Sequence, residues 1–223
     1  MTNLILKSEI LNNVLENKSI TRQEIIEIYQ KSIQSPNDLF LTAQELRIKN
    51  KGNTVTFSKK AFLNIINLCK DTCSYCTYKA EPGDEKISLM SKQQINQVLE
   101  LAKKYKCVEA LFVTGEQPEK KYPEAQEWLK ENGFKSTTEY LVHSSEIALE
   151  LGLFPHTNAG NLNFEEMKEL KKTNVSMGIM LENVSERLTK KGMPHYLAAS
   201  KKPQTRLKIL ENSGKLGIPM TTG

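Results

Sequence analysis

Three of the four cysteines in this chain lie within eight residues. Cys69, Cys73 and Cys76 have the spacing C-x3-C-x2-C in the segment "CKDTCSYC", which directly follows an apolar run. Thiolates are the ligands that bind zinc and iron–sulfur clusters. Three thiolates from one short loop leave one iron of a [4Fe–4S] cluster free to bind a small ligand. The spacing therefore favours a [4Fe–4S] cluster at this loop.

Two other interpretations of the cysteines remain open. The spacing i, i+4, i+7 is also one face of a helix, where cysteines can be buried as small apolar residues. Against a helix, Asp71, Thr72 and Ser74 favour turns. A zinc site usually combines two separated pairs of ligands. The remaining thiol, Cys107, is expected at the opposite, amino-terminal end of the next strand and could not easily complete such a site.

Apolar segments and amphipathic helical segments alternate from about residue 61 onward. A strand, a helix and a second strand in this order produce parallel strands. The candidate strands are residues 61–68, 108–115, 153–159, 174–181 and 217–223. Because the G-x-G-x-x-G fingerprint of dinucleotide-binding folds is absent, a barrel is favoured over a doubly wound sheet. We expect an α/β fold, a partial (β/α)6 TIM-like barrel with about five strands present.

Two domains are expected. Residues 1–53 space their apolar residues as helices do and form a helical N-terminal extension. Residues 54–223 form the barrel core, which begins with a short strand at residues 54–58. Within the core, three helices are predicted to begin with a capping box, in which the N-cap residue pairs with a Glu or Gln three residues later. The pairs are Ser91 with Gln94, Asn163 with Glu166, and Asn183 with Glu186.

The fourth candidate strand carries two different rows of side chains. One row is apolar throughout, whereas the alternate row mixes small and polar residues. This second row consists of Ser176, Gly178, Met180 and Glu182. A solidly packed barrel would prefer branched aliphatic residues inside, so this row predicts a cavity that holds a ligand. His156 and Asn158 share one face of the third strand in the same way.

The composition limits the class of protein. The chain has 31 Lys and Arg residues against 26 Asp and Glu, and its lysines are spread in pairs over predicted helices. This distribution indicates a solvated surface and no nucleic-acid partner. No apolar run approaches the roughly 18 residues of a membrane span, and charges interrupt any signal-peptide core. We expect a cytoplasmic protein with no membrane partner. A zinc-stabilised binding module and a nucleic-acid-binding protein are the alternatives from other classes.

The cysteine spacing, with the aromatic Tyr75 before the last cysteine, resembles the signature of the radical S-adenosylmethionine (radical SAM) superfamily. The resemblance implies that Cys69, Cys73 and Cys76 hold a [4Fe–4S] cluster whose free iron binds the amino and carboxylate groups of SAM. Reductive cleavage of SAM would yield a 5′-deoxyadenosyl radical that abstracts a hydrogen atom from the substrate. The protein would place the reactants and exclude water, while the cofactor supplies the chemistry.

Two further segments resemble SAM-contacting motifs of this superfamily. Thr114, Gly115 and Glu116 end the second strand, and the resemblance implies that they contact the SAM amino group. Glu182 and Arg187 follow the fourth strand, where related enzymes hold the ribose hydroxyls and the carboxylate of SAM. Tyr75 is also predicted to contact the cofactor. Each residue also has a structural interpretation, because a Gly-Glu turn can be only a turn and an Arg on a helix is commonly a surface residue.

A closer resemblance runs from about Val55 to Gly223. The segments "LFVTGEQPEKKYPEAQEWLKENGFKST" and "SMGIMLENVSERL" resemble subunit 1 of the 7,8-didemethyl-8-hydroxy-5-deazariboflavin (FO) synthase family. The resemblance implies a lyase that cyclises the tyrosine-derived hydroxybenzyl adduct of 5-amino-6-ribitylaminouracil and releases ammonia. His156, Asn158 and His195 would be the catalytic candidates on the substrate side.

The resemblance also implies partners and a missing part. A homologous radical SAM subunit would supply the adduct, and a low-potential donor such as ferredoxin or flavodoxin would supply electrons. Another radical SAM cyclase or mutase, of the menaquinone or biotin type, is the alternative within the superfamily. Family members continue past "TTG" into a glycine-rich segment and a sixth strand. We therefore expect this chain to be a fragment that keeps the cluster loop but binds SAM less well.

Overall fold

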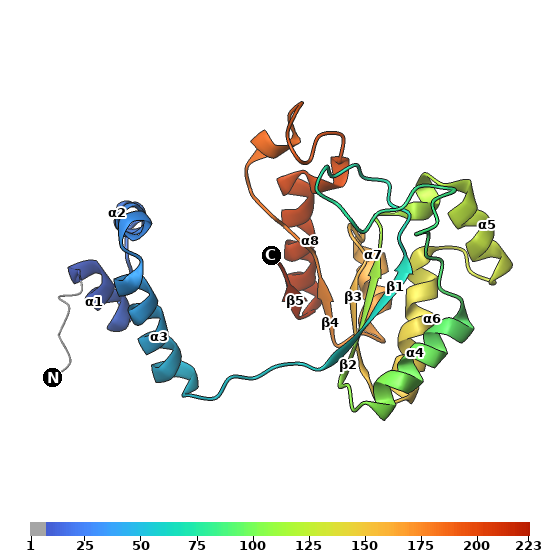
Figure 1. Ribbon diagram of the computed structural model, residues 1–223, viewed down its shortest axis with the longest axis horizontal. Helices are drawn as coiled ribbons and strands as arrows, with labels where there is room; N and C mark the ends of the chain where they lie inside the picture. The colour runs from blue at the N-terminus through green and yellow to red at the C-terminus, as the bar shows by residue number, and fades with distance from the viewer. Residues whose placement is uncertain (1–7) are drawn as a thin grey trace. The chain divides into compact units, whose positions relative to one another are not determined.

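A computed structural model describes residues 8–223, so residues 1–7 of the expected helical extension lie outside the described residues. The chain divides into two compact units, residues 1–57 and residues 58–223. The described part of the first unit is helical (Figure 1). Its helices are α1 (Glu9–Leu15), α2 (Arg22–Gln34) and α3 (Asn37–Lys51).

The short strand predicted at residues 54–58 is wrong. Val55 and Phe57 are 78% and 88% exposed, and the first strand begins only at Lys60. The alternation of apolar residues indicated a strand here, but an extended segment becomes a strand only when a neighbour pairs with its backbone. Within the described part of the chain, this segment has no such neighbour.

The second unit is built on a five-stranded parallel sheet, and all five predicted strands are present. They are β1 (Lys60–Ile66), β2 (Glu109–Thr114), β3 (Phe154–Asn158), β4 (Ser176–Gly178) and β5 (Met220–Thr221). Their spatial order is β1-β2-β3-β4-β5, so each strand pairs with the strand before it in the chain. In a doubly wound sheet the order would reverse at a switch point. The predicted partial TIM-like barrel is therefore confirmed.

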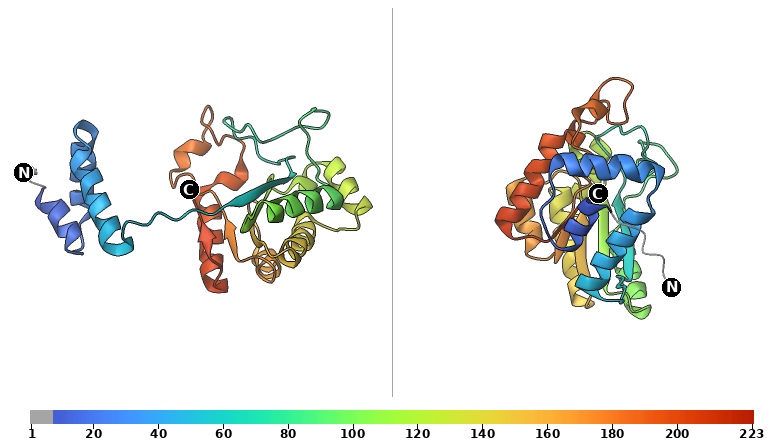
Figure 2. Two further views of the ribbon diagram at one scale, coloured as in Figure 1. Left: turned by 60° about the horizontal axis from the view of Figure 1, so that its bottom comes forward. Right: turned by 90° about the vertical axis from the view of Figure 1, so that its left-hand side faces the viewer.

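Helices cover one face of this sheet, as Figures 1 and 2 show. They are α4 (Lys92–Lys104), α5 (Pro123–Glu131), α6 (Thr137–Glu150), α7 (Phe164–Lys171) and α8 (Pro203–Leu216). Alternate strand residues such as Leu63, Phe112 and Met177 are at most 1% exposed and belong to one core with the apolar faces of these helices. The other row of side chains on each strand points to the opposite face of the sheet, where the functional site lies.

Two of the three predicted capping boxes are confirmed, at the starts of α4 and α7. The third is wrong, because residues 183–190 hold only a short 3-10 turn, η2 (Glu186–Thr189). The Asn183 side chain accepts a hydrogen bond from the Ser185 N–H, and Ser185 caps the turn. A tight turn at Glu182, whose φ is +64°, precedes the segment and redirects Asn183 away from a helical cap.

Candidate functional site

The three clustered cysteines lie on an irregular loop that follows β1. The loop contains a turn in which the Cys76 N–H bonds to the Cys73 carbonyl at 3.1 Å, and it has no helix. The interpretation of these cysteines as one face of a helix is therefore wrong. All three line one cavity of about 250 Å³ at the carboxyl edge of the sheet. Cys107 precedes β2, at the other edge.

The end of β2 is bonded directly to the cysteine loop. The Glu116 N–H donates to Cys69 Sγ at 3.2 Å, and the Lys70 N–H donates to the Glu116 carbonyl at 2.9 Å. This close approach requires Gly115, because a Cβ there would lie 2.0 Å from the Leu68 carbonyl oxygen. The residues Thr114 and Gly115, predicted from sequence as cofactor contacts, also line the cavity.

Glu116 is a buried acid of the cavity and is only 4% exposed. Its Oε2 accepts a hydrogen bond from the Asn161 N–H at 2.9 Å, whereas its Oε1 is buried and has no partner within the described residues. Burial raises the pKa of this carboxyl, and the Asn161 hydrogen bond opposes the rise. A buried acceptor without a donor is costly, so Oε1 is poised for a donor from a ligand.

Arg206, on α8, lines this cavity and was not predicted from sequence as a site residue. It is 4% exposed, and its guanidinium donates to the carbonyls of Ser200 and Met180 at 2.9 and 3.1 Å. Its Nη2 lies 3.9 Å from Glu116 Oε2. The one available signal was its chemistry, because arginine is rare in this lysine-rich chain and suits a buried position with several hydrogen bonds.

Arg187, which was predicted to contact SAM, is not brought to the cavity. Its side chain is exposed on η2 and does not belong to the lining residues. The physical reason is the tight turn at Glu182, after which the chain leaves the sheet edge instead of starting a helix there. Glu182 itself does line the cavity.

Asp71 is a buried acid inside the cysteine loop, 4% exposed, and the sequence indicated it only as a turn former. Its carboxylate accepts hydrogen bonds from the Ser200 N–H and the Ser200 hydroxyl. The same hydroxyl accepts a hydrogen bond from Arg206 Nη2 at 3.3 Å. These bonds satisfy the buried carboxylate and connect the cysteine loop to the start of α8.

The three substrate-side candidates lie at different depths. Asn158, on β3, lines the cavity. His156 and His195 do not line it, and they are buried, with exposed fractions of 7% and 4%. His156 Nδ1 lies 2.7 Å from Ser176 Oγ, so the predicted row of small residues on β4 does pack beside it. A Cβ at Gly178 would lie 3.0 Å from His156 Nε2.

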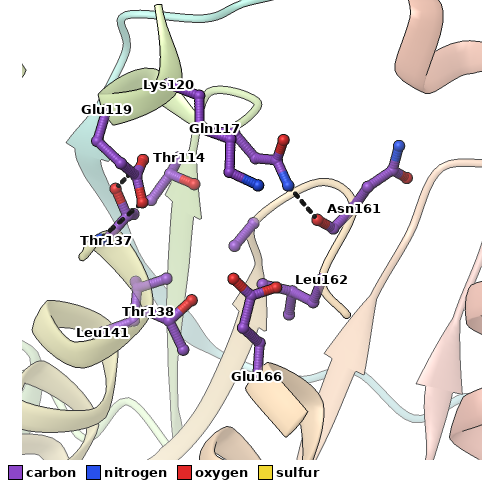
Figure 3. A pocket seen from close by; sticks show the side chains of 11 residues that line it. Thr114, Gln117, Glu119, Lys120, Thr137, Thr138, Leu141, Asn161, Leu162 and Glu166 are labelled. Atoms are coloured by element: carbon purple, nitrogen blue, oxygen red, sulfur yellow. Dashed lines mark hydrogen bonds between the residues drawn. The ribbon is translucent and has the colours of Figure 1, made fainter. Parts of the chain in front are cut away.

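A smaller cavity of about 20 Å³ lies beside Thr114, and several of the residues that line it are hydrogen-bonded to one another (Figure 3). The Glu119 carboxylate accepts two hydrogen bonds from Thr137, and Gln117 Nε2 donates to the Asn161 carbonyl at 3.2 Å. Lys70 Nζ donates to Gln117 Oε1 at 2.7 Å. These hydrogen bonds hold Asn161 in place, and the Asn161 N–H in turn donates to Glu116.

We expect the stability of the chain to fall on acidification through His156. Burial lowers the pKa of this imidazole, whereas in the unfolded chain it takes up a proton near the ordinary value of 6.5. The free energy of unfolding therefore decreases as the pH drops below about 6.5. Urea denaturation of the wild type and H156Q at pH 7, 6 and 5 should show a shallower loss in H156Q. Parallel losses in the two proteins would contradict this assignment.

The residues of the cavity fit a cysteine-bound cluster and a zwitterionic ligand. Burial raises the pKa of the Cys69 and Cys73 thiols, so a bound metal group is needed to favour the thiolates. Within residues 8–223, no three His, Cys, Asp or Glu side chains are placed to hold a metal ion. The fit rests instead on three thiols from one loop around one cavity, with the unpaired Oε1 of Glu116 and the Arg206 guanidinium in the same lining.

A family model described as the radical SAM superfamily matches residues 63–223. The match begins within β1 and includes the cysteine loop, the Gly115–Glu116 turn and β5. It therefore covers nearly all of the second unit.

Several curated relatives carry the name 7,8-didemethyl-8-hydroxy-5-deazariboflavin synthase. The protein of Methanopyrus kandleri is 41% identical over 170 residues, which cover 76% of this chain and 51% of the relative. The protein of Methanococcus maripaludis strain C6 is 38% identical over 205 residues, which cover 92% and 56%. The chain thus spans about half the length of the curated relatives it matches.

Solved structures of low sequence identity share the fold. Methylornithine synthase (PylB) matches with a TM-score of 0.71 at 17% identity, over 96% of this chain and 58% of that one. HydG, a maturase of the [FeFe]-hydrogenase, matches with a TM-score of 0.67 at 16% identity, over 97% and 49%. Among the described residues, no helix is long and apolar enough to cross a membrane.

Proposed function

The chain belongs to the radical SAM superfamily, and on that premise we propose that its second unit binds a [4Fe–4S] cluster through Cys69, Cys73 and Cys76, with SAM in the adjoining cavity. The observation that carries the proposal is the convergence, in one cavity, of the three thiols with a buried Glu and a buried Arg. The zinc alternative offers no role for this second pair of side chains.

The cavity side chains complement the two charged groups of the SAM amino-acid moiety. Glu116 Oε1, which lacks a donor among the described residues, would accept from the ammonium. The Arg206 guanidinium would pair with the carboxylate, a match that its fork of donors favours. Glu182 would accept from the ribose hydroxyls. When bound, the cluster and SAM would supply a reducing electron and a 5′-deoxyadenosyl radical, and the chain would orient the reactants and exclude water.

We propose further that the reaction is the carbon–nitrogen lyase step of deazaflavin formation. The support is the name 7,8-didemethyl-8-hydroxy-5-deazariboflavin synthase, carried by relatives that are 36% to 43% identical over 169 to 205 residues. The substrate would be the hydroxybenzyl adduct of 5-amino-6-ribitylaminouracil, made by a homologous radical SAM subunit, and a ferredoxin or flavodoxin would deliver the electron. Asn158 on the cavity wall, with His156 behind it, is the proposed substrate side.

The reaction class can be tested by substrate-triggered SAM cleavage. The reconstituted chain, reduced with dithionite, should release 5′-deoxyadenosine faster with the adduct than without it, and ammonia should appear with the cyclised product. Release that responds to a different cyclase substrate, and not to the adduct, would assign the chain to another branch of the superfamily.

Glu116 provides a test of the SAM site alone. The substitution E116Q keeps the shape of the side chain but removes its charge, so it should weaken SAM binding about tenfold or more, since a hydrogen bond to a charged group contributes roughly 1.5–3 kcal/mol. Iron content should stay unchanged. The matched control is E124Q, at an exposed position at the start of α5. Equal SAM affinity in E116Q and E124Q, measured by equilibrium dialysis, would exclude this role.

A further inference from the structure

The Tyr75 hydroxyl joins the cysteine loop to two other segments of the second unit. It lies 3.2 Å from Glu182 Oε1 and 3.0 Å from His195 Nε2. Glu182 Oε1 also accepts from Lys201 Nζ at 2.7 Å. Figure 1 shows the cysteine loop and the segment after β4 beside one another at the same edge of the sheet.

The direction of these hydrogen bonds follows from what each group can donate. A carboxylate can only accept, so the Tyr75 O–H donates to Glu182. The Tyr75 oxygen then has its lone pairs left, and it accepts from His195, which must carry its proton on Nε2. The chain of bonds therefore runs from His195 through Tyr75 to Glu182.

His195 is held more firmly than either of its partners. It is 4% exposed, and the backbone of its neighbours is bonded to the cysteine loop on both sides. The Ser74 N–H donates to the Pro194 carbonyl at 3.0 Å, and the Thr72 hydroxyl donates to the Tyr196 carbonyl at 3.1 Å. Tyr75 by contrast is 51% exposed, so its ring needs a fixed partner to hold one orientation.

The Glu182 side chain needs such a restraint because its backbone hydrogen bond, from the Glu182 N–H to the Gly223 carbonyl at 2.6 Å, does not fix the carboxylate. Its side chain is about a third exposed, and its φ of +64° is a conformation that non-glycine residues adopt rarely. The bonds from Tyr75 and Lys201 both end on Oε1. Within the described part of the chain, Oε2 therefore keeps its lone pairs for a ligand in the cavity.

We propose that His195 is a positioning residue: through the Tyr75 hydroxyl it fixes the Glu182 carboxylate so that Oε2 faces the cavity and accepts from a vicinal diol of the bound ligand. The hydrogen-bond chain is independent of the proposed function. Only the identification of the diol with the SAM ribose rests on it. His195 does not line the cavity, so this role differs from direct contact with the substrate.

The chain of bonds is testable without any ligand. The protein has three histidines, so long-range ¹H–¹⁵N NMR of the labelled chain, with H195Q for assignment, resolves the tautomer of each ring. We expect His195 to be protonated on Nε2 and its Nε2 signal to shift in Y75F. A proton on Nδ1, or His195 signals that are unchanged in Y75F, would overturn the proposal.

The second arm measures SAM dissociation constants by equilibrium dialysis on reconstituted protein. Y75F and H195F should each weaken SAM binding about tenfold. The double variant should weaken it no more than either single variant does. H195Q should restore most of the affinity that is lost in H195F, because the Gln amide nitrogen replaces the Nε2–H donor of His195. Losses that multiply in the double variant would overturn the proposal. If the wild type does not bind SAM while the NMR result holds, the proposed function fails and the hydrogen-bond chain stands.

Discussion

Replacing any one of Cys69, Cys73 and Cys76 by serine is expected to reduce the iron content of the anaerobically reconstituted chain from about four per chain to less than about one. The reason is the origin of all three thiols on one loop, within which no other side chain offers a comparable soft ligand. Iron and acid-labile sulfide analysis measures this result directly, and SAM cleavage should be lost with the iron.

Cys107 provides the matched control for these variants. It precedes β2, on the opposite edge of the sheet from the cavity, and packs against the core. The substitution C107S should therefore retain the full iron content. If C107S lost the cluster, or if one of the three clustered cysteines proved dispensable, the assignment of the ligands would be incorrect.

The substitution G115A is expected to destabilise the chain by about 3 kcal/mol and to prevent cluster retention. A Cβ at this position would lie 2.0 Å from the oxygen and 2.7 Å from the carbon of the Leu68 carbonyl, and 2.8 Å from Cys69 Cα. These are backbone atoms of the loop that presents the first cysteine, so they cannot move aside without moving Cys69. The midpoint and slope of urea denaturation measure the loss of stability.

Gly214, exposed in the last turn of α8, allows the opposite comparison. Its added Cβ would meet no atom within 4 Å, so G214A should stabilise the chain by about 0.5–1 kcal/mol through helix propensity. The contrast separates the steric effect at Gly115 from the general effect of adding a methyl group. A stable, cluster-loaded G115A protein would show that the cysteine loop does not approach β2 as described.

The sheet could be predicted from sequence because its signals are local. The predicted strands are short apolar segments between helical ones, and residues such as Leu63 and Met177 are buried where the strand period places them. The fourth and fifth strands are shorter than predicted, with three and two residues. A strand ends where its neighbour stops pairing, which is a property of the register and not of the local pattern.

The site was predictable only where its residues follow strands directly. The cysteines, Glu116 and Glu182 come immediately after β1, β2 and β4, so the parallel topology alone brings them to one edge. Arg206 lies inside α8, and its approach to Glu116 depends on how that helix packs, which no local pattern reports. Arg187 lies outside the cavity for the opposite reason, since its local sequence indicated a helix that the turn at Glu182 prevents.

The central claim is that three thiols hold a four-iron cluster and leave one iron for SAM. Mössbauer spectroscopy of the ⁵⁷Fe-reconstituted chain tests it most directly, with and without SAM. The account predicts a cubane spectrum in which SAM changes the parameters of about one iron in four. A spectrum that SAM leaves unchanged, or a protein that takes up zinc in place of iron under these conditions, would contradict it.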